Sequence, residues 1–322
     1  MTENNATPPR RIIYVHGYSL KPSESVLEEF TRHAIRSGIQ RDYPEDIAAF
    51  DEADVGLAYY GDLTRPLLKD RGREYDEELD IGDRKNALIA LQSVSRRKKF
   101  GFRQYDSLPG KSAKKEFLAG IIAPVMGLLG QTMRLLGRVA PVFAAYLQNE
   151  DGLGTRIRDR VRGEIIEAME SGATLMIVSH GMGSIVAYDV LWQLSRDPRF
   201  SDHATTKVDC FVSMGAPLSD NYIRKYLLGA KSAGIERYPG NIINWLNLSA
   251  EDDYLCHDGT VADDFREMMR EHIVSRITDF RIYNQTVRYG KSNPHSSVGY
   301  LIHPRLSKII RDWLCERPGL IQ

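Results

Sequence analysis

Three places in this sequence carry the parts of a hydrolytic site, with one part missing. Asp253 and His295 supply a carboxylate and an imidazole, the pair that orients a base and moves a proton. Residues 179–183 read Ser-His-Gly-Met-Gly, between an apolar run and a helical pattern. Nucleophilic catalysis also needs an attacking oxygen or sulfur at such a bend. The residue in the middle of this bend is Gly181, which has none.

The elements that must position these residues follow from the hydrophobic pattern. Short apolar runs predict strands at 11–15, 54–60, 173–179, 208–214, 241–248 and 280–287. Helical spacing of apolar residues predicts helices at 23–37, 86–94, about 182–195 and about 304–314. Strands that alternate with helices indicate parallel βαβ units, and near-continuous apolar strands indicate a sheet covered on both faces. We therefore predict an α/β fold with a mostly parallel sheet of about six strands.

The bend and its context resemble the α/β-hydrolase superfamily of lipases and esterases. In that family the nucleophile is the serine of G-x-S-x-G, on a sharp strand-to-helix turn whose small flanking residues let strand and helix approach. Here Ser179 stands for the first glycine, Gly183 is the last, and Gly181 occupies the serine position. Ser179 at the strand end and Ser184 in the helix are not at the apex, so neither is expected to replace the nucleophile.

The family order of nucleophile, acid and histidine implies roles for later residues. Asp253, after the strand at 241–248, corresponds to the acid, with Asp252 as the fallback. His295, before the last helix, corresponds to the base, whereas His303 immediately precedes the proline that opens that helix. His16-Gly17-Tyr18 matches the family's His-Gly-x turn, which implies an oxyanion hole made by the N–H groups of Tyr18 and Met182. The resemblance covers residues 10–62 and 154–314 and implies no cofactor and no metal.

Residues 65–149 interrupt this pattern. They contain a strongly basic run at 96–115 and then an uncharged run at 117–133. We expect residues 1–64 and 150–322 to form the hydrolase core and 65–149 an inserted helical cap or lid, which would suit an apolar acyl group. The alternatives are a helix lying in a membrane interface, with the basic run beside it, or a membrane span.

The amino-acid composition argues for or against several other functional classes and cellular settings. The 43 basic and 43 acidic residues cancel, which argues against a nucleic-acid binder. Three widely spaced cysteines without a CxxC pair, and an N-terminus without an apolar signal-like run, favour a cytoplasmic setting, with peripheral membrane contact through 96–147 left open. An acidic cluster at 251–264 lacks the spacing of a calcium loop. Nothing in the sequence indicates an oligomeric state.

These features together predict a carboxylic ester hydrolase, esterase- or lipase-like, without its nucleophile and so nearly inactive. Two origins of Gly181 remain open: inactivation of a working hydrolase, or a natural non-catalytic relative that binds ligands. Survival of Asp253, His295 and both oxyanion turns favours the first. A further alternative is a membrane-surface interaction protein that acts through the cap.

Overall fold

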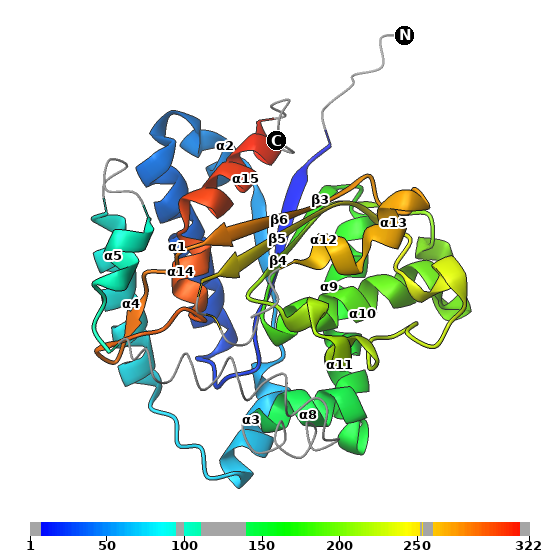
Figure 1. Cartoon of the computed structure of the whole chain (residues 1–322), viewed down its shortest axis with the longest axis horizontal. Helices are drawn as coiled ribbons and strands as arrows, with labels where there is room; N and C mark the ends of the chain where they lie inside the picture. Colours follow the sequence, from blue (N-terminus) through cyan, green and yellow to red (C-terminus); the bar gives the residue numbers. More distant parts are fainter. Residues whose placement is uncertain (1–7, 95–99, 111–139, 252, 254–259, 316–322) are drawn as a thin grey trace.

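The computed structural model describes residues 8–94, 100–110, 140–251, 253 and 260–315. Six strands form one parallel sheet in the order β2-β1-β3-β4-β5-β6 (Figure 1). The strands are β1 (Arg10–Val15), β2 (Asp54–Ala58), β3 (Thr174–His180), β4 (Val208–Met214), β5 (Ile242–Ala250) and β6 (Arg276–Ile282). A small antiparallel hairpin, β7 (Val287–Arg288) and β8 (Lys291–Ser292), follows β6.

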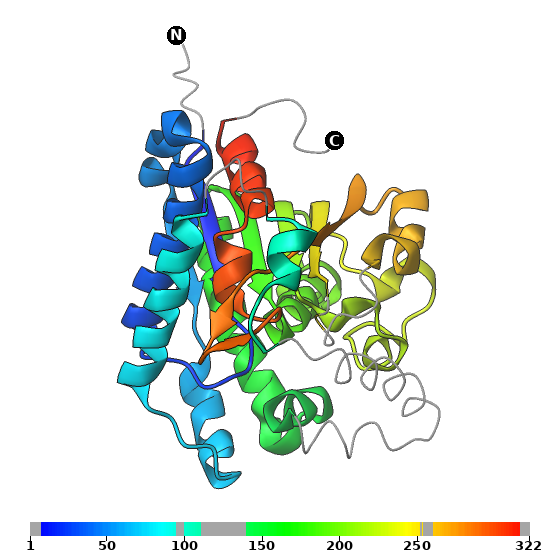
Figure 2. The same cartoon turned by 60° about the vertical axis from the view of Figure 1, so that its left-hand side comes forward.

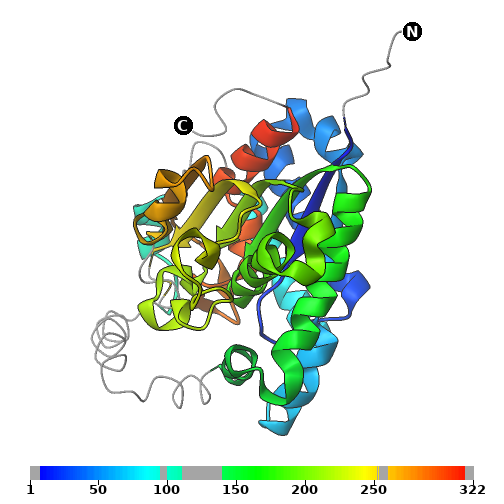
Figure 3. The ribbon, with the colours of Figure 1, turned by 90° about the vertical axis from the view of Figure 1, so that its right-hand side faces the viewer.

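Helices cover both faces of the sheet. One face carries α1 (Glu24–Asp42), α2 (Ile47–Glu52), α4 (Glu77–Gln92), α14 (Ser297–Leu301) and α15 (Pro304–Leu314), with α1 and α4 side by side (Figure 2). The other carries α3 (Gly61–Asp70), α8 (Pro141–Gln148), α9 (Leu153–Glu170), α10 (Met182–Arg196), α11 (Asn221–Arg224), α12 (Val261–Asp264) and α13 (Arg266–Arg270) (Figure 3). The short helix α5 spans Phe102–Asp106.

Alternation along the strands explains the two layers. In β1, Ile13 and Val15 pack with α9 and α10, whereas Ile12 and Tyr14 pack with α1 and α15, and all four are at most 2% exposed. Side chains of a strand point alternately to opposite faces, so a strand apolar at every position must be covered on both. The predicted α/β class, with a six-stranded parallel sheet flanked by helices, is confirmed.

Several predicted elements differ from the observed bounds, and two of them by the most residues. The last strand, expected at 280–287, is β6 and ends at Ile282, because the following Asn284 is buried and its side chain bonds to loop carbonyls instead of continuing the sheet. The helix expected at 86–94 begins at Glu77, after Asp76, whose carboxylate caps it by accepting the N–H of Leu79. The capping carboxylate and the acidic residues of the first turn both favour a helix start here, and the pattern of apolar residues reveals neither.

The block 65–149 contributes to both faces where the structure describes it. From α4, Ala87, Leu88 and Leu91 pack into the core beside α1, and α8 packs on α9. The uncharged run 117–133 lies outside the described residues, so the inserted cap remains a prediction. Within the part of the chain that the structure describes, no helix combines the length and apolar character that crossing a membrane requires.

A close approach between β1 and α10 depends on Gly183. A Cβ atom at Gly183 would lie 2.4 Å from the carbonyl oxygens of both Val15 and His16. Both obstacles are backbone atoms in the centre of the fold, so they cannot rotate away. The helix N-terminus can therefore reach the carboxyl edge of the sheet only with glycine at this position.

Gly183→Ala is expected to lower the free energy of unfolding by about 2–3 kcal/mol or more, as overpacking in a rigid core does. Chemical denaturation followed by circular dichroism measures this loss. Gly163→Ala is the matched control, because Gly163 is an exposed glycine of α9 with no heavy atom within 4 Å of its Cβ position. That variant should gain about 0.5–1 kcal/mol from helix propensity. Equal stabilities of the two variants would contradict the close approach.

Candidate active site

Gly181 forms the apex of a sharp bend between β3 and α10, at the carboxyl edge of the sheet. Its backbone has φ 56° and ψ −124°, a conformation that residues with side chains adopt only under strain. Gly181 donates its N–H to the carbonyl of Met214 at 2.8 Å and accepts from the N–H of Ser184 at 3.1 Å. The bend is thus fixed from both sides, directly at the N-terminus of α10.

A carboxylate–imidazole pair faces this bend. Nδ1 of His295 lies 2.9 Å from Oδ2 and 3.1 Å from Oδ1 of Asp253. Asp253 is 2% exposed, whereas the His295 side chain keeps 21% of its surface in solvent. The hydroxyl of Tyr300 donates to Oδ2 of Asp253 at 3.0 Å and accepts from the N–H of Ala250 at 2.9 Å. A carboxylate on Nδ1 favours the proton there, which leaves Nε2 as the basic nitrogen.

The free side of the imidazole points at the apex of the bend. A Cβ atom at Gly181 would lie 3.3 Å from Nε2 of His295 and 3.4 Å from Cε1. A hydroxyl one bond beyond that Cβ would be within hydrogen-bond reach of the imidazole. The site therefore has a base, His295, and a carboxylate, Asp253, that orients it. The basic nitrogen faces position 181, where glycine supplies no oxygen.

The loop that carries His295 is held by an asparagine that the sequence did not reveal. Asn284 is fully buried, and its amide donates to the carbonyl of Pro294 at 2.8 Å and to that of Ser296 at 2.9 Å. These two carbonyls flank His295 on either side. Gly299 leaves room for this side chain, because a Cβ there would lie 1.8 Å from Oδ1 of Asn284. Asn284 thereby fixes the backbone from which the imidazole projects.

The loop after β1 lies against the first turn of α10. Besides the contact at Gly183, a Cβ atom at Gly17 would be 3.2 Å from Nδ1 of His180. Tyr18 and Met182 therefore lie on two neighbouring backbone segments, as a pair of oxyanion donors would require. The assignment of their N–H groups to that role remains a prediction.

His16, at the start of this loop, is a neutral structural histidine. The N–H of Tyr60 donates to its Nε2 at 3.1 Å, so the ring proton is on Nδ1, 2.7 Å from the carbonyl oxygen of Gly17. Its ring stacks on that of Tyr60 with 4.0 Å between centroids. Burial, helped by the nearby charge of Lys21, lowers the pKa of His16 to about 3. The imidazole thus anchors the loop rather than moving protons.

The remaining serines near the bend are engaged elsewhere. Ser179 and Ser184 are fully buried and share a hydrogen bond of 2.9 Å between their hydroxyls, and Ser179 also donates to the carbonyl of Val212 at 2.9 Å. Neither hydroxyl is available at position 181. The fallback acid Asp252 lies outside the described residues, and the structure brings Asp253 to His295.

Stability should fall in mild acid because three buried histidines are held neutral. Burial lowers the pKa of His16 and His303 to about 3 and that of His180 well below its usual value. Their unfolded forms bind protons below pH 6.5, so stability is full above that pH and declines as pH falls toward 3. Asp189 acts in the opposite sense, since burial raises its pKa to about 6. On unfolding at pH 5 the three histidines each take up about one proton, and Asp189 releases about one. The net uptake of about two protons makes the free energy of unfolding change by roughly 2.7 kcal/mol per pH unit.

Urea unfolding at pH 7, 6 and 5 measures this slope. His303→Asn is the control, because His303 accepts the N–H of Arg305 through Nδ1 as the cap of α15, and asparagine also caps helices without titrating. That variant should lose about one proton from the slope. An unfolding free energy that does not change between pH 7 and pH 5 would show that these imidazoles are not held neutral.

Comparisons of the chain with protein-family models, with curated proteins and with solved structures gave no match. The architecture shown is α/β, a parallel sheet of six strands flanked by helices. Among the described residues, no group of three or more His, Cys, Asp and Glu side chains is placed to hold a metal ion.

Proposed function

We propose that this chain is a carboxylic ester hydrolase of the α/β-hydrolase type in which glycine has replaced the nucleophilic serine. One observation carries the proposal. Nε2 of His295 lies 3.3 Å from the Cβ position of Gly181, while Asp253 binds the other ring nitrogen. A buried carboxylate, an imidazole and a sharp bend at a helix N-terminus are the parts that activate a hydroxyl at that position.

With a serine at position 181, each residue would have a defined role. His295 would take the hydroxyl proton as the oxygen attacks the ester carbonyl, and would pass it to the leaving alcohol. Asp253 would hold the imidazole in the required tautomer and stabilise its charged form. The N–H groups of Tyr18 and Met182 would stabilise the oxyanion. With glycine, only activation of water by His295 remains, on the order of 10³ over the uncatalysed rate.

The substrate class follows from the same proposal. We infer a small-molecule ester with an apolar acyl group, by analogy with caps that line such sites. Contact with a membrane surface through residues 96–147 is compatible with this, since lipid-like esters partition there. No nucleic acid and no cofactor are required, and a cytoplasmic setting is proposed.

A covalent probe tests the proposal without knowledge of the substrate. Gly181→Ser should react stoichiometrically with a fluorophosphonate, and peptide mass spectrometry should place the adduct on residue 181. The parent chain and the double variant Gly181→Ser, His295→Ala are the controls and should remain unlabelled. A folded Gly181→Ser protein that forms no adduct would contradict the assignment of the nucleophile position.

The glycine itself favours a second candidate, a non-catalytic binding protein that uses the same site. Glycine accepts the backbone angles of the bend without strain, so a protein that only binds would be stabilised by it. This candidate predicts ester binding without turnover, even in Gly181→Ser.

A further inference from the structure

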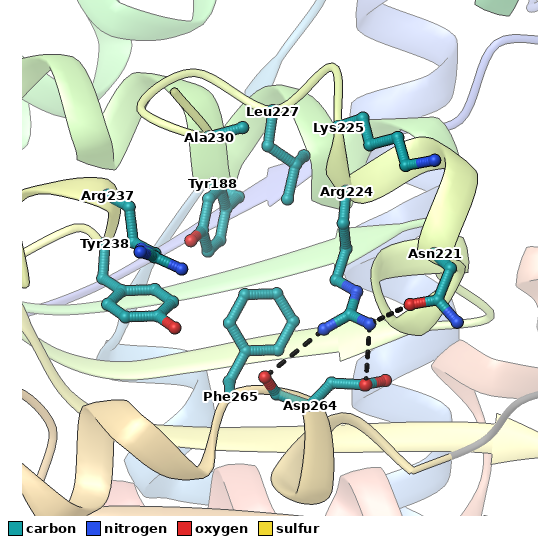
Figure 4. A pocket seen from close by; sticks show the side chains of 10 residues that line it. All are labelled: Tyr188, Asn221, Arg224, Lys225, Leu227, Ala230, Arg237, Tyr238, Asp264 and Phe265. Carbon is teal, nitrogen blue, oxygen red and sulfur yellow. Dashed lines mark hydrogen bonds and ion pairs between the residues drawn. The ribbon is translucent and has the colours of Figure 1, made fainter. Parts of the chain in front are cut away.

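A hollow opens on the α10 face of the sheet, away from His295 (Figure 4). It has a volume of about 290 Å³ and lies between α10, the segment from α11 onward, and α12–α13. Its lining combines aromatic and cationic side chains: Tyr188, Tyr238, Phe265, Arg224, Lys225 and Arg237. None of the residues of the candidate active site is among them, so the hollow needs an explanation of its own.

The apolar wall of the hollow is rigid. Phe265 and Tyr188 are 2% and 1% exposed, and their ring centroids are 5.7 Å apart. Trp245 packs behind both, 4.9 Å from Phe265 and 5.9 Å from Tyr188. The two rings present only a small accessible area to the hollow, and an apolar group can contact that area without rearranging the core.

Tyr188 is a buried side chain that lines the wall of the hollow. Among the described residues nothing accepts from its hydroxyl or donates to it, so the hydroxyl can bond to a molecule in the hollow. Tyr146 and Tyr300 are buried to the same degree and donate to Asp189 at 2.6 Å and to Asp253 at 3.0 Å. Burial raises the pKa of Tyr188 well above its usual value, which keeps the hydroxyl a donor.

The charges around the hollow are unbalanced toward positive. Arg224 is paired with Asp264, at 2.9 Å between the guanidinium and Oδ1. Arg237 and Lys225 have no carboxylate within 4.0 Å in the described part of the chain. Nε of Arg237 donates to the carbonyl of Gly234 at 3.1 Å, and its guanidinium carbon lies 5.8 Å from the ring centroid of Tyr238, so the guanidinium is held at the edge of the hollow. In Figure 4 the Tyr188 hydroxyl and Arg237 lie on the same side, with Arg224 opposite.

We propose that this hollow binds a small organic carboxylate with a flat apolar body. The carboxylate would accept from the Tyr188 hydroxyl and from the terminal N–H groups of Arg237, a guanidinium geometry that matches two carboxylate oxygens. The body would lie against Phe265. The surplus of positive charge disfavours a cation, and a neutral molecule would leave it unbalanced. This site is independent of the proposed hydrolase function, and its test requires no turnover.

Benzoate and its uncharged isostere benzamide are suitable probes, titrated into the full chain and followed by calorimetry and by ligand-observed NMR. Benzoate should bind with one-to-one saturation, at least about tenfold more tightly than benzamide. Arg237→Gln should weaken benzoate about tenfold or more, and Tyr188→Phe, which keeps the ring, about threefold to tenfold. Arg199→Gln is the control: Arg199 is an exposed arginine paired with Asp197, and its variant should bind as the parent does.

Thermal unfolding of each variant shows whether its fold is intact. Tyr188→Phe conserves the buried ring and should stay folded even if Arg237→Gln does not. The proposal is overturned if benzamide binds as well as benzoate, if Tyr188→Phe retains the parent's affinity, or if benzoate shows no saturable binding in the millimolar range. None of these results depends on whether Gly181→Ser hydrolyses esters.

Discussion

Gly181→Ser is expected to hydrolyse short acyl esters at least about 10³-fold faster than the chain with glycine. Removal of the serine from a comparable triad costs about 10⁶ in turnover, and the activity that remains is about 10³ over the uncatalysed rate. The gain of roughly 10³ to 10⁶ corresponds to roughly 4–8 kcal/mol of barrier. Initial rates with p-nitrophenyl acetate and butyrate measure it.

The same substitution should lower stability. A serine at φ 56° and ψ −124° carries strain on the order of 1–3 kcal/mol. Its Cβ would also lie 3.3 Å from Nε2 of His295, so the imidazole must shift by a few tenths of an ångström. We therefore expect activity to rise while the free energy of unfolding falls. Such a trade-off between stability and activity is common at catalytic positions.

Gly181→Ala separates the two effects. Alanine brings the same backbone strain and the same Cβ contact but no oxygen, so it should lose stability without gaining rate. If Gly181→Ser is folded and no faster than Gly181→Ala, the lapsed-enzyme interpretation is wrong and the non-catalytic binding protein takes its place. A serine codon at this position in the source gene would identify the glycine as an inactivating change.

The sheet could be predicted from the sequence because its central strands β3 and β4 are mostly apolar. The strand at 208–214 and the helix at 304–314 have the predicted bounds. The strand predicted at 280–287 is part of β6, which begins earlier, at Arg276, and ends at Ile282. Asn284 is as buried as a strand residue, but its side chain bonds to the loop around His295, and that tertiary contact leaves no trace in periodicity.

Some residues of the candidate site could likewise be predicted from the sequence, and others could not. Gly181, Asp253 and His295 could be chosen because each follows a predicted strand, and parallel strands bring their carboxyl ends to one edge. Tyr300 could not be chosen, because it lies in the mostly apolar helix α14 and its partner Asp253 is 47 positions away in the sequence. Residues that only position the catalytic side chains belong to no sequence motif, so the three-dimensional structure is needed to identify them.

Asp253→Asn in the Gly181→Ser background is expected to lower kcat by about 10⁴ with little change in KM. The Asp253 carboxylate accepts from Nδ1 of His295 at 2.9 Å, whereas an asparagine amide can present its NH₂ group and favour the tautomer with the proton on Nε2. An imidazole protonated on Nε2 cannot take the hydroxyl proton from residue 181. The ground state would bind ester as before, because Asp253 is buried behind the imidazole.

Asp252→Asn in the same background is the matched control, one residue away in the chain and identical in chemistry. It should retain kcat within about twofold, since the contact to His295 comes from Asp253. A reversal, with Asp252→Asn inactive and Asp253→Asn active, would assign the acid to the neighbouring residue. Loss of activity in neither variant would mean that His295 is oriented by its loop alone, through the two carbonyls that Asn284 holds, and that the carboxylate contributes stability rather than catalysis.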